Sequence, residues 1–140
     1  MTATLDPTTG GGARAMERLA AEKIGWLTTV NPDGQAQSSP LWFLWTDEEI
    51  FVYSHKTAPR NRNIERNPKV SFNLNTDTGG GDVVSMEGTA RFDPDGPLCS
   101  QHPAYLAKYG KWLQGCGGPE FMDRDYPIII RITPTRWRTA

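Results

Sequence analysis

The stretch IGWLTTVNPDGQAQSSPLWFLWTDEEIFVYS, residues 24–54, decides the fold of this chain. It holds three runs rich in apolar, β-branched and aromatic residues, which is typical of strands: Ile24–Val30, Gln35–Trp45 and Ile50–Ser54. Asn31-Pro32-Asp33-Gly34 is typical of a tight turn, and only the polar residues 46–49 separate the second run from the third. Connections this short leave no room for a crossover helix, so we expect antiparallel strands.

Elements predicted on either side complete a small domain. Helical spacing of apolar residues predicts helices at Ala13–Glu22 and Pro97–Gln114, and further strands are predicted at Val70–Leu74, Val83–Phe92 and Tyr126–Thr133, the last ended or bent by Pro134. Six or so antiparallel strands with two or three short helices predict a mainly β fold, a β-barrel with short helices. Residues 1–12, rich in Thr, Gly and Pro, are predicted to form a flexible tail, and residues 13–140 a single domain.

Composition narrows the classes of partner. The 140 residues carry 15 Lys and Arg against 16 Asp and Glu, a balance that argues against a protein coating nucleic acid or an anionic membrane surface. The longest apolar run, Leu41–Trp45, is far shorter than the about 20 residues that span a bilayer. With no secretory signal in residues 1–12, we expect a soluble cytoplasmic protein with no membrane and no nucleic-acid partner.

The aromatic content predicts self-association. Five Trp, five Phe and four Tyr give more large apolar faces than the interior of a 140-residue barrel is expected to hold, which favours a homodimer. Cys99 and Cys116, with His102 between them, match no zinc motif, so no metal site is predicted.

Positive charge is concentrated in SHKTAPRNRNIERNPKVS, residues 54–71. Five positive side chains and one negative one lie between Lys56 and Lys69, whereas the rest of the chain has 10 positive against 15 negative. Pro59 suits the first turn of a helix that Pro68 would stop, so the cluster begins where a strand ends and a helix starts. A helix N-terminus attracts anions, and Lys56 and Arg60 beside it suit phosphate. A solvated basic helix face is the alternative interpretation.

In the order of its motifs the chain resembles the flavin and deazaflavin oxidoreductases of the split β-barrel, pyridoxamine-phosphate-oxidase-like superfamily. The motifs are Leu-Thr-Thr-Val before an Asp-Gly turn, Ser-Pro-Leu-Trp-Phe on the next strand, and a basic loop followed by Arg-Asn-Ile-x-x-Asn-Pro-Lys-Val. The likeness covers roughly residues 13–133 and is strongest to the F420-dependent actinobacterial branch. It implies an FMN-binding-like split barrel that forms a homodimer, with cofactors across the subunit interface.

The resemblance also implies the cofactor-binding residues. The family's phosphate site falls on Lys56, Arg60, Asn61 and Arg62, with Ser54 as a further donor, and the edge along the cofactor ring falls on Ser38, Ser39, Pro40, Leu41 and Trp42. Pro40 lacks an N–H and therefore marks either an unpaired edge or a bulge. Packing in the core or dimer interface is the alternative role for Trp42.

The expected cofactor is coenzyme F420, with FMN as the alternative. The chain ends Arg136-Trp137-Arg138 where vitamer oxidases of the family carry a basic-x-His pattern, which argues against vitamer oxidation. The basic cluster suits the extended negative charge of F420, and a deazaflavin would transfer hydride to a small electron-poor acceptor. Tyr53, His55 or water could supply the proton, and no catalytic side chain is assigned. A non-catalytic carrier of flavin, deazaflavin or haem remains the alternative.

Overall fold

The computed structural model describes residues 2–140, so Met1 of the predicted tail lies outside the described residues. Within this range it has a seven-stranded sheet made of β1 (Ile24–Val30), β2 (Ala36–Trp42), β3 (Leu44–Thr46), β4 (Glu49–Ser54), β5 (Lys69–Asn73), β6 (Val84–Phe92) and β7 (Ile128–Thr139). Four short helices accompany it, α1 (Gly10–Ala21), α2 (Pro59–Arg66), α3 (Pro103–Gln114) and α4 (Pro119–Asp125).

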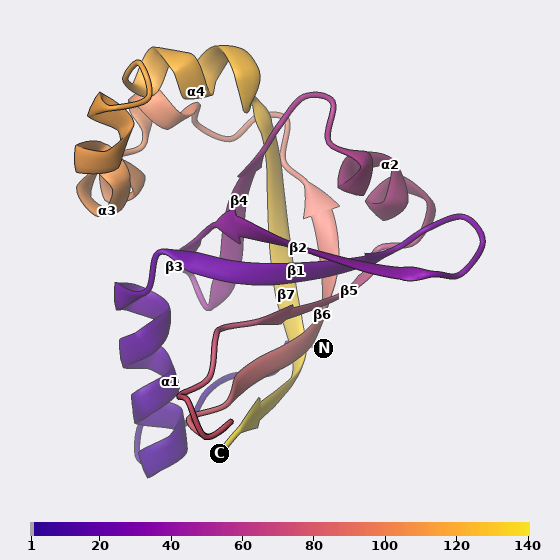
Figure 1. Cartoon of the computed structure of the whole chain (residues 1–140), viewed down its shortest axis with the longest axis vertical. Helices are drawn as coiled ribbons and strands as arrows, with labels where there is room; N and C mark the ends of the chain where they lie inside the picture. The colour runs from indigo at the N-terminus through magenta and orange to yellow at the C-terminus, as the bar shows by residue number, and fades with distance from the viewer. Residues whose placement is uncertain (1) are drawn as a thin grey trace.

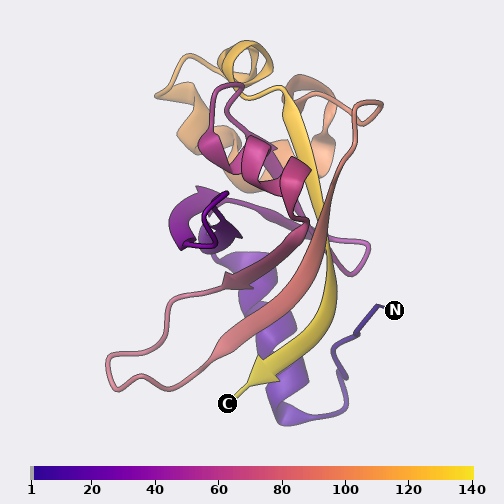
Figure 2. The same cartoon turned by 90° about the vertical axis from the view of Figure 1, so that its right-hand side faces the viewer.

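The sheet is curled and antiparallel throughout. Its strand order is β2-β1-β5-β6-β7-β4-β3, so that β7 joins the two groups of strands that come earlier in the chain. Figure 1 shows β7 along most of the molecule, with α3 and α4 at one end and α1 at the other. Figure 2 shows β6 and β7 curving together. The predicted mainly β fold with short helices is confirmed.

The strand predicted as Gln35–Trp45 is interrupted at Phe43. β2 pairs with β1 as far as Trp42, and β3 pairs with β4 from Leu44, at the opposite end of the strand order. At Phe43 the backbone N–H is hydrogen-bonded to a side chain and not to a neighbouring strand, because it donates to the Tyr109 hydroxyl at 2.8 Å. The chain thereby passes from one edge of the sheet to the other, and β2 is left with one unpaired side, which supports the edge interpretation of Pro40.

Pro134 bends the last strand without ending it. The register between β6 and β7 pairs Gly88 with Pro134 and Glu87 with Arg136, so that Thr135 is an extra residue in a bulge. The bulge accommodates a proline that cannot donate to the ladder, and β7 continues to Thr139. Of the two effects predicted for Pro134, the bend is the one found, and the strand extends beyond the predicted Thr133.

β4 separates two hydrophobic clusters. Ile50 and Val52 face the cluster between the sheet and α1, whereas Phe51 and Tyr53 face a second cluster against α3 and α4. Successive side chains of a strand point to opposite faces, so a strand covered on both sides is buried at nearly every position. Ser54, at the end of β4, is therefore fully buried at the boundary between the two layers.

The first helix begins before the predicted Ala13. Thr9 is its N-cap and accepts a hydrogen bond from the Gly12 N–H at 3.0 Å, which brings Gly10–Gly12 into the first turn. Ahead of the helix, the Ala3 N–H donates to the Pro134 carbonyl at 2.8 Å and Leu5 is buried. The flexibility expected for residues 1–12 stays a prediction.

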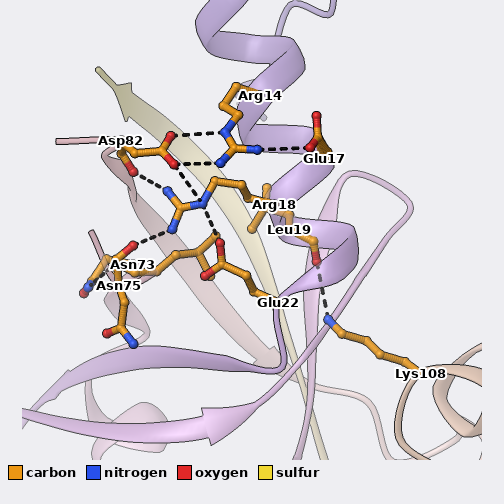
Figure 3. A network of polar contacts seen from close by, with 10 residues as sticks. Arg14, Glu17, Arg18, Leu19, Glu22, Asn73, Asn75, Asp82 and Lys108 are labelled. Carbon is orange, nitrogen blue, oxygen red and sulfur yellow. Dashed lines mark hydrogen bonds and ion pairs between the residues drawn. The ribbon is translucent and has the colours of Figure 1, made fainter. Parts of the chain in front are cut away.

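A polar network fastens α1 to the loop between β5 and β6 (Figure 3). Arg18 is buried, pairs with the carboxylates of Glu22 and Asp82, and donates to the carbonyls of Asp82 and Asn75. Arg14 reaches the same Asp82 at 3.0 Å. Each of these contacts involves a charged group, the stronger class of hydrogen bond.

The segment between β6 and β7 holds more helix than predicted. α3 covers most of the expected Pro97–Gln114, after a 3-10 turn at Cys99–Gln101, but α4 occupies residues for which no element was predicted. Both helices pack on the β4 face that carries Phe51 and Tyr53. No helix within residues 2–140 is long and apolar enough to cross a membrane.

Candidate functional site

A cleft of about 640 Å³ lies between the edge strand β2, the β4–α2 junction and the α3–α4 layer. Its walls come from β2 (Pro40, Leu41, Trp42), from the junction (Tyr53, His55, Ala58, Arg60) and from the helical layer (Tyr105, Leu113, Cys116, Phe121, Met122, Tyr126). Most of these side chains are apolar or aromatic, with a few polar groups, which is the usual make-up of a small-molecule site.

The β4–α2 junction brings predicted residues into one hydrogen-bonded group. The Arg60 guanidinium donates to the Ser54 hydroxyl at 3.2 Å and to the Ser39 hydroxyl at 3.1 Å. Ser54 also donates to the Asn61 side-chain oxygen at 2.8 Å, and Asn61 donates to the His55 carbonyl at 2.9 Å. The end of β4, the start of α2 and the middle of β2 are thus held together.

The positive charge of Arg60 is not neutralised by the described residues. No carboxylate within residues 2–140 pairs with this half-buried side chain, whose polar contacts are two hydroxyls. Burial lowers the pKa of Arg60 from its usual value, because desolvation disfavours the charged form. A guanidinium remains charged even so, and a bound anion would compensate it.

The N-terminus of α2 lies beside this guanidinium, although the Ala58 and Asn61 N–H groups are already bonded to the His55 and Ala58 carbonyls. Ala58 is the N-cap and makes no side-chain capping bond, and Pro59 follows at the first helical position. Ala58 and Arg60 both line the cleft, so the positive end of the helix dipole and the guanidinium face the same space.

Three predicted residues point elsewhere. Lys56 forms an ion pair with Asp125 at 3.1 Å and its side chain is 48% exposed. Arg62 is exposed on α2, and Ser38 lies next to the Thr28 hydroxyl at 2.5 Å, on the face of β2 opposite to Ser39. Their predicted contacts with a cofactor stay predictions.

Trp42 lies in the cleft wall and is also packed against α3. Its ring stacks on Tyr109 with centroids 4.6 Å apart and planes 7° apart, and the edge of Trp112 approaches it at 5.9 Å. Packing, the alternative role considered for Trp42, is thus found, and its predicted contact with a cofactor stays a prediction. Trp112 is 48% exposed at this rim.

The two side chains considered as proton sources, Tyr53 and His55, differ in whether the atom that carries the proton is already hydrogen-bonded. The Tyr53 hydroxyl donates to the Pro97 carbonyl at 2.6 Å, and burial raises its pKa well above the usual range. His55 accepts a hydrogen bond at Nδ1 from the Thr57 N–H at 3.1 Å, which leaves Nε2 to carry the proton. His55 lines the cleft beside Tyr126, with ring centroids 5.1 Å apart.

The sequence prediction missed the contribution of α4. Phe121 and Met122 line the cleft from a segment for which no element was predicted, and Tyr126, the C-cap of α4, lines it from the predicted start of a strand. Pro119 at the first helical position and Glu120 in the first turn are a helix-start signal that could have identified it. The C-terminal Arg136–Arg138 does not line this cleft, because Trp137 packs against Trp45 and Arg138 pairs with Glu87.

The model of the family described as pyridoxamine 5'-phosphate oxidase matches residues 13–140. The chain belongs to this family. The predicted split-barrel class is therefore confirmed, and this family member falls in a superfamily of flavin-binding oxidoreductases. No curated protein gave a match.

Solved structures share the fold of this family member. A conserved hypothetical protein of Mycobacterium tuberculosis is 26% identical, with a TM-score of 0.73 over 99% of this chain and 89% of that one. An F420 reductase is 24% identical, with a TM-score of 0.68 over 87% and 94%. The haem storage protein HutZ of Vibrio cholerae is 21% identical, with a TM-score of 0.61 over 98% and 95%. At the identities of the last two, the likeness concerns the fold alone.

Proposed function

We propose that the protein is an F420-dependent oxidoreductase that transfers a hydride between reduced deazaflavin and a small electron-poor organic acceptor. The observation that carries this proposal is the half-buried Arg60, which faces a largely apolar cleft with no carboxylate partner among residues 2–140. A charge in such a position is costly unless an anion joins it. The shared fold of an F420 reductase supports the choice of cofactor.

The described residues fit a cofactor that has an acidic end and a flat ring. Arg60, held by Ser39 and Ser54, and the first turn of α2 would bind the acidic groups. The free edge of β2 at Pro40–Trp42 would lie along the ring, and the aromatic α3–α4 wall would exclude water from the acceptor. When bound, reduced F420 would supply the hydride, and the protein would supply orientation.

Titration with F420 and, separately, with FMN tests the cofactor, with tryptophan fluorescence as the signal because Trp42 lines the cleft. We expect F420 to bind at micromolar concentration or tighter and FMN much more weakly. Tighter binding of FMN would contradict the choice of F420 while leaving a flavin site in place.

Two variants test the position of the site. Arg60→Ala should weaken F420 binding at least about tenfold, since a charge-assisted, partly buried contact is lost. Lys69→Ala is the matched control, because it removes the same charge from an exposed residue of the same basic cluster that does not line the cleft. Equal affinities of the two variants would place the anion elsewhere.

A further inference from the structure

One hydroxyl in the cleft wall is buried without a hydrogen-bond partner. Tyr105, on α3, is 0% exposed, and its Oη finds no partner within residues 2–140. Buried polar groups are nearly always paired, because an unpaired one loses its bonds to water without replacement. The unpaired hydroxyl of Tyr105 is therefore unusual for a buried polar group.

Two neighbouring tyrosines pack against Tyr105, and the hydroxyl groups of both are hydrogen-bonded. The rings of Tyr53 and Tyr109 both lie 4.8 Å from that of Tyr105. The Tyr53 hydroxyl donates to Pro97, and the Tyr109 hydroxyl bonds to the backbone of Phe43. The middle hydroxyl of this tyrosine row is thus the unpaired one, and it belongs to a residue that lines the cleft.

We propose that the Tyr105 hydroxyl donates a hydrogen bond to an oxygen of the ligand that occupies the cleft, a carbonyl oxygen conjugated with the double bond that receives the hydride. The deep wall of the cleft would then select acceptors that carry such an oxygen. Because the hydroxyl is covered in this state, the bond requires a side chain of the cleft wall to move as the ligand enters.

The protonation state agrees with the role of a donor. Burial raises the pKa of Tyr105 far above its ordinary value, so the hydroxyl keeps its proton at neutral pH. A neutral phenol that stays protonated gives a hydrogen bond to a developing negative charge without releasing its proton.

The inference rests on the proposed function for its source of hydride. When bound, reduced deazaflavin would supply a hydride to the β-carbon of an α,β-unsaturated carbonyl compound, so that a C–H bond would form there and the deazaflavin would be oxidised. The electron pair of the C=C bond shifts toward the carbonyl oxygen, which gains negative charge that the Tyr105 hydrogen bond stabilises. A proton from water then completes the saturated product at the α-carbon.

The hydrogen bond can be tested without turnover. Benzalacetone, isotope-labelled at its carbonyl carbon, is added to the full-length protein without cofactor, and the carbonyl stretch is followed by infrared difference spectroscopy. A hydrogen bond to the carbonyl lowers this frequency. We expect the shift in the unaltered protein and its loss in Tyr105→Phe, together with about tenfold weaker binding of benzalacetone.

Tyr109→Phe is the matched control. It removes a hydroxyl from the same helix and the same tyrosine row, but one that is already bonded to the backbone. This variant should lower the melting temperature and keep the carbonyl shift, whereas Tyr105→Phe should keep the melting temperature and F420 binding.

Two outcomes would overturn the inference. If the carbonyl stretching frequency is not lowered in the unaltered protein, the proposed hydrogen bond does not form. If it is lowered equally in Tyr105→Phe, a group other than Tyr105 donates the bond. Failure of F420 to bind the unaltered protein would refute the proposed function alone, because the infrared experiment contains no cofactor.

Discussion

Burial divides the basic cluster residue by residue. Arg60 is half-buried at the cleft, whereas Lys56 is committed to Asp125 and Arg62 is exposed. The concentration of charge could be predicted from the sequence. The division could not, because it depends on Asp125, which lies 69 positions after Lys56 in the chain.

For the other predicted site residues too, the place in the chain could be predicted from the sequence, whereas the direction of the side chain could not. Local sequence placed Ser54, Arg60 and Asn61 at a strand-to-helix junction, and the structure brings them together there. Ser38 and Ser39 could not be told apart by type, since only the pleat of β2 decides which one faces Arg60.

Tyr109→Phe should destabilise the protein by about 1–3 kcal/mol, because the Phe43 N–H would lose its partner where the sheet is interrupted. Urea denaturation followed by circular dichroism measures the loss. The control is Tyr105→Phe, which removes an unpaired hydroxyl and should leave the free energy of unfolding unchanged or higher. Equal destabilisation by both variants would contradict this account of the tyrosine row.

At the scale of elements, the cap of α3 links stability to pH. His102 is the N-cap and accepts from the Tyr105 N–H through Nδ1, which requires the neutral ring. Burial, with the charge of Arg131 as a smaller cause, lowers the pKa of His102 below its usual 6.5. The unfolded chain then binds more protons between the two pKa values, so stability falls as pH decreases through that window.

Replacement of this cap should remove the pH dependence it causes. His102→Asn keeps a good N-cap that does not titrate. Between pH 7.5 and pH 5.5 the unaltered protein should lose more free energy of unfolding than the variant, by less than about 1 kcal/mol because solvent screens the partly exposed ring. Parallel pH profiles from urea denaturation would show that His102 is not the group responsible.

Close packing between β1 and β5 gives another prediction for the elements. A Cβ added at Gly25 would lie 2.3 Å from the ring of Phe72, so Gly25→Ala should destabilise the sheet by about 1–3 kcal/mol. Gly110, inside α3, has nothing within 4 Å of an added Cβ. Gly110→Ala should therefore stabilise the protein by about 0.5–1 kcal/mol, and thermal unfolding of both variants checks the opposite signs.

Element boundaries show where local sequence stops being informative. The strands of residues 24–54 were predicted nearly as found, since alternation and turn residues are local signals. The interruption at Phe43 was not, because its cause is the hydroxyl of Tyr109 on a helix 66 positions later. The continuation of β7 past Pro134 likewise depends on a partner strand that tolerates the bulge.

For the whole molecule, the homodimer expected from the aromatic content stays a prediction. β2 is an edge strand with a largely exposed surface, and Trp112 is 48% exposed beside the cleft. Sedimentation equilibrium should therefore give twice the chain mass of 15.6 kDa at micromolar concentration. A mass of one chain at every concentration would contradict the homodimer. Ligand binding alone would then have to explain why Trp112 is exposed beside the cleft.

The place of β7 in the sheet has a consequence for synthesis. β7 lies between β6 and β4 in the sheet but follows both in the chain. During synthesis on the ribosome, the hairpin of β3 and β4 therefore has no neighbouring strand until the segment Ile128–Thr139 has emerged. Contacts this distant in sequence form slowly. In pulse-labelling of refolding protein, the amides of β4 that bond to β7 should become protected from exchange after those that join β1 and β2, so the assembly of the cleft is one of the last events of folding.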